Sequence, residues 1–140
     1  MPQPKSTVSP PSKRRVLVVE DDPVVSTLFR DYLLMRYEVE VFRSFKAFRT
    51  AAPALRSRSE EFLCAVLDYH LLDGNASAVI PMLTMPVIVV TGDKSIKKLR
   101  GAAFVLHKPT VFGDLAGCLE KLEEARYNKE NGHGDADESI

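Results

Sequence analysis

The sequence predicts an α/β fold built on a doubly wound, five-stranded parallel sheet. Its apolar runs without polar interruption are typical of strands that a parallel sheet buries on both faces. Segments with apolar residues at helical spacing separate these runs, so that strand and helix alternate five times along the chain. Right-handed crossovers between consecutive strands then place helices on both faces of the sheet.

The first strand and helix lie near the start of the chain. The run Val16–Val19 predicts the strand. Pro23 follows Asp22, a combination that indicates a helix start with aspartate as N-cap and proline in the first turn. We expect this helix to span about 23–35. Its predicted core face consists of Val25, Leu28, Phe29, Tyr32 and Leu33.

The alternating sequence Glu38–Phe42 predicts an edge strand with one wetter face. A second helix should start at Ser44, and Pro53 should end or kink it. Residues 56–61 form a charged connection to the next strand, which starts at Phe62. The inward residues of the second helix are Phe45, Phe48 and Ala52.

Two of the later helices are predicted to be short. The third has only residues 75–85 available, and Pro81 disturbs it. The fourth must fit into 93–100, which as a helix reaches only about 12 Å. Such a short helix depends on packing, here by Ile96 and Leu99.

The last strands and the last helix complete the pattern. Strands are expected at 86–91 and 104–108, and a final helix at about 111–126. The apolar positions of that helix are Phe112, Leu115, Ala116, Leu119 and Leu122.

Polar residues end four of the predicted strands, namely Glu20 with Asp21 and Asp22, then Asp68, Thr91 and Lys108. Because ligands bind at the carboxyl ends of the strands in an open parallel sheet, we expect these side chains to converge. Clustered carboxylates repel one another, and their hard oxygen atoms favour Mg²⁺. The alternative for the acidic segment is a solvated strand end with a helix cap.

In this order the residues resemble the receiver domain of two-component response regulators, over about Arg14 to Arg126. The resemblance implies a flavodoxin-like or CheY-like sheet in the order 2-1-3-4-5. It also implies that Asp68 accepts a phosphoryl group. Asp21 would bind Mg²⁺ directly, and Glu20 would act on the metal through water.

The resemblance assigns three further roles. The backbone carbonyl of His70 would be a metal ligand, and Thr91 would donate its hydroxyl to the phosphoryl group. Lys108 would pair with that group, and the typical cis peptide would fall at Lys108-Pro109. A haloacid-dehalogenase-type phosphatase also uses a strand-end aspartate, but it needs an acid where His70 stands.

The chain departs from the receiver pattern at the aromatic position three residues before Lys108, which is Val105. Phe104 is adjacent, but neighbouring strand residues point to opposite faces. Leu72 stands where receivers usually have proline. The basic segment from Lys94 to Arg100 favours a solvated face, with docking of an acidic partner as the alternative.

We therefore expect a single-domain response regulator, phosphorylated by a histidine kinase or a histidine phosphotransfer protein. Its catalysis would be limited to autophosphotransfer and slow self-dephosphorylation, so it would not be an enzyme in the ordinary sense. The signal would pass to an unknown downstream protein, and a homodimer is possible by resemblance. The alternative is a receiver-like binding module for which phosphorylation is irrelevant.

Composition agrees with one domain and excludes several partners. The chain has 140 residues, of which 45% are hydrophobic, and its net charge is zero, so nothing suggests binding to nucleic acid or a membrane surface. No apolar run is long enough to span a membrane. Cys64 and Cys118 are expected as core thiols in a reducing cytoplasm. Residues 1–13 and 127–140 are polar and predicted to be disordered tails around a domain of residues 14–126.

Overall fold

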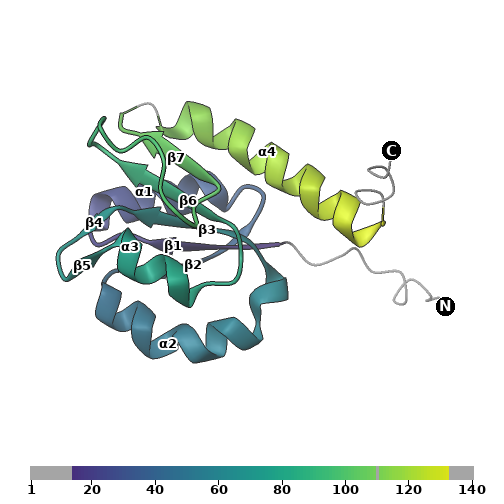
Figure 1. Ribbon diagram of the computed structural model, residues 1–140, viewed down its shortest axis with the longest axis horizontal. Coiled ribbons are helices and arrows are strands. Elements are labelled where there is room, and N and C mark those ends of the chain that lie inside the picture. Colours follow the sequence, from purple (N-terminus) through teal and green to yellow (C-terminus); the bar gives the residue numbers. More distant parts are fainter. Residues whose placement is uncertain (1–13, 110, 133–140) are drawn as a thin grey trace.

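The computed structural model describes residues 14–109 and 111–132. One parallel five-stranded sheet forms its centre, with the strands in the order β2-β1-β3-β6-β7 (Figure 1). Counted along the chain within this sheet, the order is 2-1-3-4-5, so the predicted topology is confirmed. The strands are β1 (Arg15–Val19), β2 (Glu38–Phe42), β3 (Phe62–Asp68), β6 (Val87–Thr91) and β7 (Phe104–His107).

Helices cover both faces of this sheet (Figure 1). On one face, side chains of α1 and α4 pack with Val16 and Val18 of β1. On the other, side chains of α2 and α3 pack with Leu17 and Val19. The alternation within β1 thus divides the core into two layers. The helices are α1 (Pro23–Leu33), α2 (Phe45–Ser57), α3 (Ala76–Val79) and α4 (Val111–Glu130).

The first helix begins as predicted but buries a narrower face. Asp22 caps it, because its Oδ1 accepts hydrogen bonds from the backbone N–H of Val24 at 2.8 Å and of Val25 at 3.2 Å. Phe29 is buried, whereas Leu28 is 51% exposed, so the prediction that Leu28 faces the core is wrong. The inward stripe of α1 is Ser26, Phe29 and Leu33, whose spacing leaves Leu28 outside it. Tyr32, which was also predicted to face the core, is 36% exposed.

The second helix is longer than the sequence indicates. Ser44 caps it through a hydrogen bond from the Ala47 N–H, as predicted. Pro53 does not end it, and the helix continues to Ser57. Pro53 lies on the exposed side, where the helix can lose one backbone hydrogen bond without burying an unpaired carbonyl. A 3₁₀ turn at Ser59–Glu61 leads into β3.

The third helix is short, as predicted, and the fourth is absent. α3 has four residues and gives way to a 3₁₀ turn at Ile80–Met82. Residues 92–103, which were expected to hold the fourth helix, contain turns and no helix. The Asp93 carboxylate accepts hydrogen bonds from both the N–H and the hydroxyl of Ser95, as a helix-capping residue would, but no helix follows it. Gly101 then takes a left-handed conformation with φ +87°.

The final helix extends beyond its predicted end at residue 126 to Glu130. The Arg126 guanidinium donates to the carbonyls of Phe62, at 3.1 Å, and Glu60, and so ties α4 to the start of β3. Glu130 accepts from Arg126 at 2.9 Å and pairs with Arg14 at 2.7 Å. Residues 127–130 are therefore helical, while 1–13 and 133–140 lie outside the described residues.

Two smaller expectations concern the thiols and the membrane. Cys64 and Cys118 are free and buried, as predicted. Among the described residues, no helix has the length and apolar character that a membrane span needs.

We predict that Gly101→Ala destabilises the fold by about 1–3 kcal/mol, because φ is positive and the new methyl carbon would lie 2.6 Å from Ile80 Cγ2. The control is Gly117→Ala in α4, where a methyl group meets nothing within 4 Å. It should stabilise by up to about 1 kcal/mol. Urea denaturation measures both. Equal stability of Gly101→Ala and the natural chain would contradict this backbone conformation.

Candidate functional site

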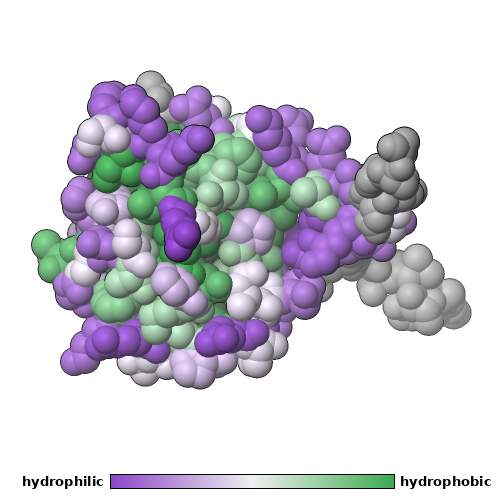
Figure 2. Space-filling view, viewed as in Figure 1, coloured by the Kyte–Doolittle hydropathy of each residue, from purple (hydrophilic) through white to green (hydrophobic). Residues whose placement is uncertain are grey.

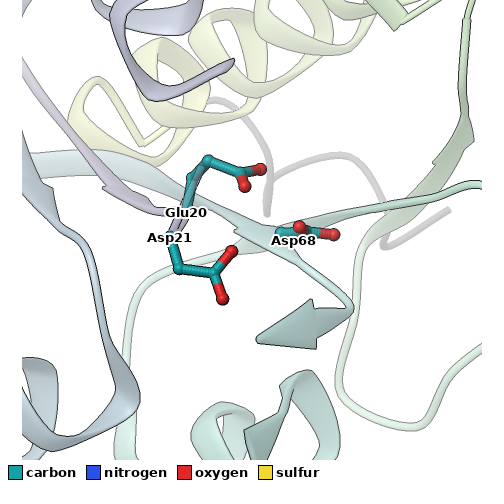
Figure 3. A group of neighbouring side chains, drawn as sticks. All are labelled: Glu20, Asp21 and Asp68. Atoms are coloured by element: carbon teal, nitrogen blue, oxygen red, sulfur yellow. The ribbon is translucent and has the colours of Figure 1, made fainter. Parts of the chain in front are cut away.

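Three carboxylates converge at the carboxyl ends of β1 and β3. Glu20 and Asp21 directly follow β1, and Asp68 is the last residue of β3 (Figure 3). One carboxylate oxygen from each lies within 4.8 Å of the others. Parallel pairing of β1 with β3, with Val19 opposite Leu67, brings these ends together. The predicted convergence of the acids is thus present for Glu20, Asp21 and Asp68. Asp22 does not belong to this cluster, because its carboxylate caps α1.

Glu20 has the most unusual environment of the three. It is 1% exposed, and its Oε2 accepts one hydrogen bond, at 3.1 Å, from the Asp22 N–H. Its Oε1 is buried without a hydrogen-bond partner among the described residues. Burial raises the pKa of this carboxyl group to about 7, the Asp22 N–H opposes the shift, and the neighbouring Asp68 adds to it.

The unpartnered oxygen of Glu20 fits a cation site. A buried carboxylate without a partner is costly, and a bound cation or its water ligands would supply the missing interaction. All three side chains offer only hard oxygen atoms, which suits Mg²⁺ better than a thiolate- or imidazole-binding metal. Glu20, Asp21 and Asp68 therefore fit the predicted metal.

Asp21 is held by the hairpin that follows β3. Its Oδ2 accepts a hydrogen bond from the Leu72 N–H. The hairpin consists of β4 (His70–Leu71) and β5 (Gly74–Asn75), which pair antiparallel. His70 is exposed, and its N–H lies 3.4 Å from Asp68 Oδ1. The role of the His70 carbonyl as a metal ligand stays a prediction.

Lys108 directly follows β7 and Thr91 ends β6, so both stand at the same edge of the parallel sheet as the acids. The Lys108 Nζ lies 3.7 Å from Asp68 Oδ1, and its backbone N–H donates to the Thr91 carbonyl at 2.9 Å. Thr91 is completely buried, and its Oγ1 accepts a hydrogen bond from the Asp93 N–H at 3.0 Å. The peptide bond between Lys108 and Pro109 is cis, as expected. A methyl group added at Gly92 would meet nothing within 4 Å, so there is open space beside Thr91.

Asp73 also supports the site, although the sequence does not predict this role. Its two carboxylate oxygens accept hydrogen bonds from the N–H groups of Phe45, at 2.8 Å, and Lys46, at 3.0 Å. These bonds lower the pKa of Asp73 and fasten the hairpin to the first turn of α2. The hairpin in turn presents the Leu72 N–H to Asp21. The Asp73-Gly74 pair signals a turn in the sequence, but its contact with α2 spans 28 residues.

The departure at Val105 is confirmed in three dimensions. Val105 packs partly buried on the α2 and α3 side of the sheet, and Phe104 packs on the α1 and α4 side. Phe104 therefore cannot replace an aromatic ring at position 105.

Comparison with known proteins supports the fold. No family model and no curated protein sequence matches the chain. Solved structures do match, and among them a response regulator receiver domain protein from Clostridium thermocellum is 18% identical with a TM-score of 0.70, covering 81% of this chain and 97% of that chain. The non-phosphorylated HemR receiver domain from Leptospira biflexa is 24% identical with a TM-score of 0.64, and the match covers 79% of this chain and 94% of that chain.

A third similar structure carries a bound ion. The response regulator TrrA from Thermotoga maritima, in complex with Mg²⁺ and BeF, is 19% identical with a TM-score of 0.64, covering 78% of this chain and 98% of that chain. The chain thus has the fold of response regulator receiver domains. At these identities the likeness concerns the fold alone.

We predict that Glu20→Gln stabilises the metal-free protein at pH 8 by up to about 3 kcal/mol, because it removes a charge that burial disfavours. The pKa of Glu20 is raised in the folded state from 4.5 to about 7. The folded chain therefore binds the proton more tightly, and stability falls as pH rises from 4.5 to 7. Glu20→Gln should lack this part of the pH dependence.

Urea denaturation in EDTA at pH 5 and pH 8 measures this difference, with Glu120→Gln on the exposed side of α4 as control. Added Mg²⁺ should stabilise the natural chain at pH 8 more than Glu20→Gln. The same pH dependence in both chains would show that Glu20 is not the buried titrating group.

Proposed function

We propose that this chain is a response regulator receiver domain that accepts a phosphoryl group on Asp68. The donor would be a phosphohistidine on a histidine kinase or a phosphotransfer protein. One observation carries the proposal. The Lys108 Nζ lies 3.7 Å from Oδ1 of Asp68, and the Asp68 carboxylate lies beside those of Glu20 and Asp21. The Asp68 carboxylate thus has an ammonium group and two further carboxylates near it.

The chemistry is an in-line displacement at phosphorus. A carboxylate oxygen of Asp68 forms the new O–P bond as the P–N bond to the donor imidazole breaks. The imidazole leaves with the electron pair of that bond and takes up a proton. Mg²⁺, when bound, supplies positive charge to the oxygens of the phosphoryl group.

Two residues of the chain can also stabilise the negative charge of the phosphoryl group. The Lys108 ammonium, which pairs with Asp68 in the absence of phosphate, can pair with a phosphoryl oxygen instead. The Thr91 hydroxyl has its oxygen engaged by the Asp93 N–H, and its hydrogen is available for donation to the phosphoryl group. Because the Asp93 bond links Thr91 to residues 92–103, a shift of Thr91 would move the start of that segment.

The proposed output is contact with a downstream protein. The catalytic contribution of the chain would be limited to its own phosphorylation and slow hydrolysis of the acyl phosphate. A haloacid-dehalogenase-type phosphatase fits the site less well, because the residue two positions after Asp68 is the exposed His70.

The first test is phosphorylation itself. Incubation with phosphoramidate and Mg²⁺ should add one phosphoryl group of the acyl phosphate type, which base hydrolyses, because Asp68 is the buried carboxylate that Lys108 contacts. Asp68→Asn should abolish the modification, and Asp31→Asn on the exposed side of α1 should not. Intact mass spectrometry measures the added phosphate. Labelling of Asp68→Asn at the natural rate would overturn the assignment.

The second test concerns the response. Few backbone hydrogen bonds anchor residues 92–103, so amide hydrogen exchange there should be fast at rest. Phosphorylation, or beryllofluoride with Mg²⁺, should change exchange in this segment more than in α2, because Thr91 immediately precedes it. If 92–103 is as protected as β3 and indifferent to the mimic, the signal leaves through another part of the molecule.

A further inference from the structure

Among the described residues, no helix connects β6 to β7 on the sheet face that carries α2 and α3. Residues 92–103 cross this region as an irregular segment, and only a few of their side chains reach the core. Leu99 and Ala102 pack there partly buried, together with Val105 of β7. In doubly wound folds each crossover normally lays a helix on such a face. On this face Val87 and Val89 of β6 are buried, whereas Val105 of β7 is only partly buried, so the apolar cover is incomplete at β7.

A groove lies beside this segment. It has a volume of about 420 Å³ and runs between α3 with its following turn and residues 99–101. Its apolar walls come from Ile80, Pro81 and Leu99. Figure 2 shows apolar residues gathered in the middle of this face with polar residues around them. Gly101 lies so close to Ile80 that a larger residue would push the two walls apart.

The segment beside the groove is strongly basic. Lys94, Lys97, Lys98 and Arg100 are all exposed within seven residues. Within residues 14–109 and 111–132, no carboxylate forms an ion pair with any of these four cations. The nearby Asp93 directs its carboxylate to Ser95 instead. Positive charge is therefore concentrated here in a chain whose net charge is zero.

We propose that this groove binds an acidic amphipathic helix of a partner protein, in the place where the fold lacks its own helix. The apolar side of the partner helix would enter the groove against Ile80 and Leu99. Its acidic flank would face Lys97, Lys98 and Arg100. A small apolar ligand could fill the groove but would leave the cations unused, and charge complementarity therefore favours the acidic helix.

This inference does not depend on the proposed phosphorylation. The groove and the cations lie outside the acidic cluster, so binding should persist in Asp68→Asn and without Mg²⁺. Failure to phosphorylate and failure to bind a helix are thus separate results. If the chain is phosphorylated and also binds the helix, the hydrogen bond between the Asp93 N–H and Thr91 would connect the two sites. Phosphorylation could then change the affinity of the groove for the partner helix.

The experiment uses the full chain and designed peptides as probes. A labelled sixteen-residue helix with leucines on one side and glutamates on both flanks is compared with its lysine-flanked counterpart. Fluorescence anisotropy should show binding of the acidic peptide at least about tenfold tighter than of the basic one, weakened by salt. Amide chemical shifts should change at residues 77–80 and 96–101.

A charge-matched pair of variants locates the site. Reversal of Lys97, Lys98 and Arg100 to glutamate should weaken acidic-peptide binding about tenfold or more. Reversal of Arg36, Arg43 and Arg56, which are exposed elsewhere, changes the net charge equally and should have a much smaller effect.

Four results would overturn the proposal. The first is that no acidic peptide binds, and the second is that the two triple variants bind the acidic peptide equally tightly. The third is that the chain dimerises through this groove. The fourth is that the peptide binds only after removal of residues 133–140, which would assign the groove to the chain's own end.

Discussion

The buried negative charge at the end of β1 is the constraint on which the site depends. Glu20 is carried into the interior by a strand that is buried on both faces, and one of its oxygens has no partner there. The neighbouring Asp68 makes this charge more costly and raises the pKa of Glu20 further. The fold therefore keeps an unfavourable charge cluster that a cation can relieve, with Lys108 at its edge.

The cluster is connected to the surrounding segments by a few hydrogen bonds. The hairpin after β3 holds Asp21 through the Leu72 N–H, and Asp73 fastens this hairpin to α2. On the other side, Thr91 accepts from the Asp93 N–H at the start of the segment that lacks a helix. Under the proposed phosphorylation of Asp68, we expect the 92–103 segment to respond, because few backbone hydrogen bonds anchor it.

The sheet and the site positions could be predicted from the sequence because their signals are local. Apolar runs mark buried strands, and each site residue stands at the end of such a run. The missing helix could not be predicted in this way, because the segment length and two apolar residues allow a helix of about two turns, and whether so short a helix forms depends on tertiary packing. The exposure of Leu28 follows from the rotation of α1 against its neighbours, and the Asp73 contact with α2 depends on tertiary structure. None of these is visible in a stretch of sequence.

A crystal structure of the chain with Mg²⁺ and beryllofluoride would test the proposed phosphorylation of Asp68 and the metal site together. We expect beryllium bonded to a carboxylate oxygen of Asp68, and a metal ion ligated by Asp21 and Asp68 close to Glu20. The Lys108 ammonium should lie against a fluorine atom, and the Thr91 hydroxyl should donate to another. A structure in which Asp68 is unmodified at saturating beryllofluoride, or in which the ion lies away from the three carboxylates, would contradict the account.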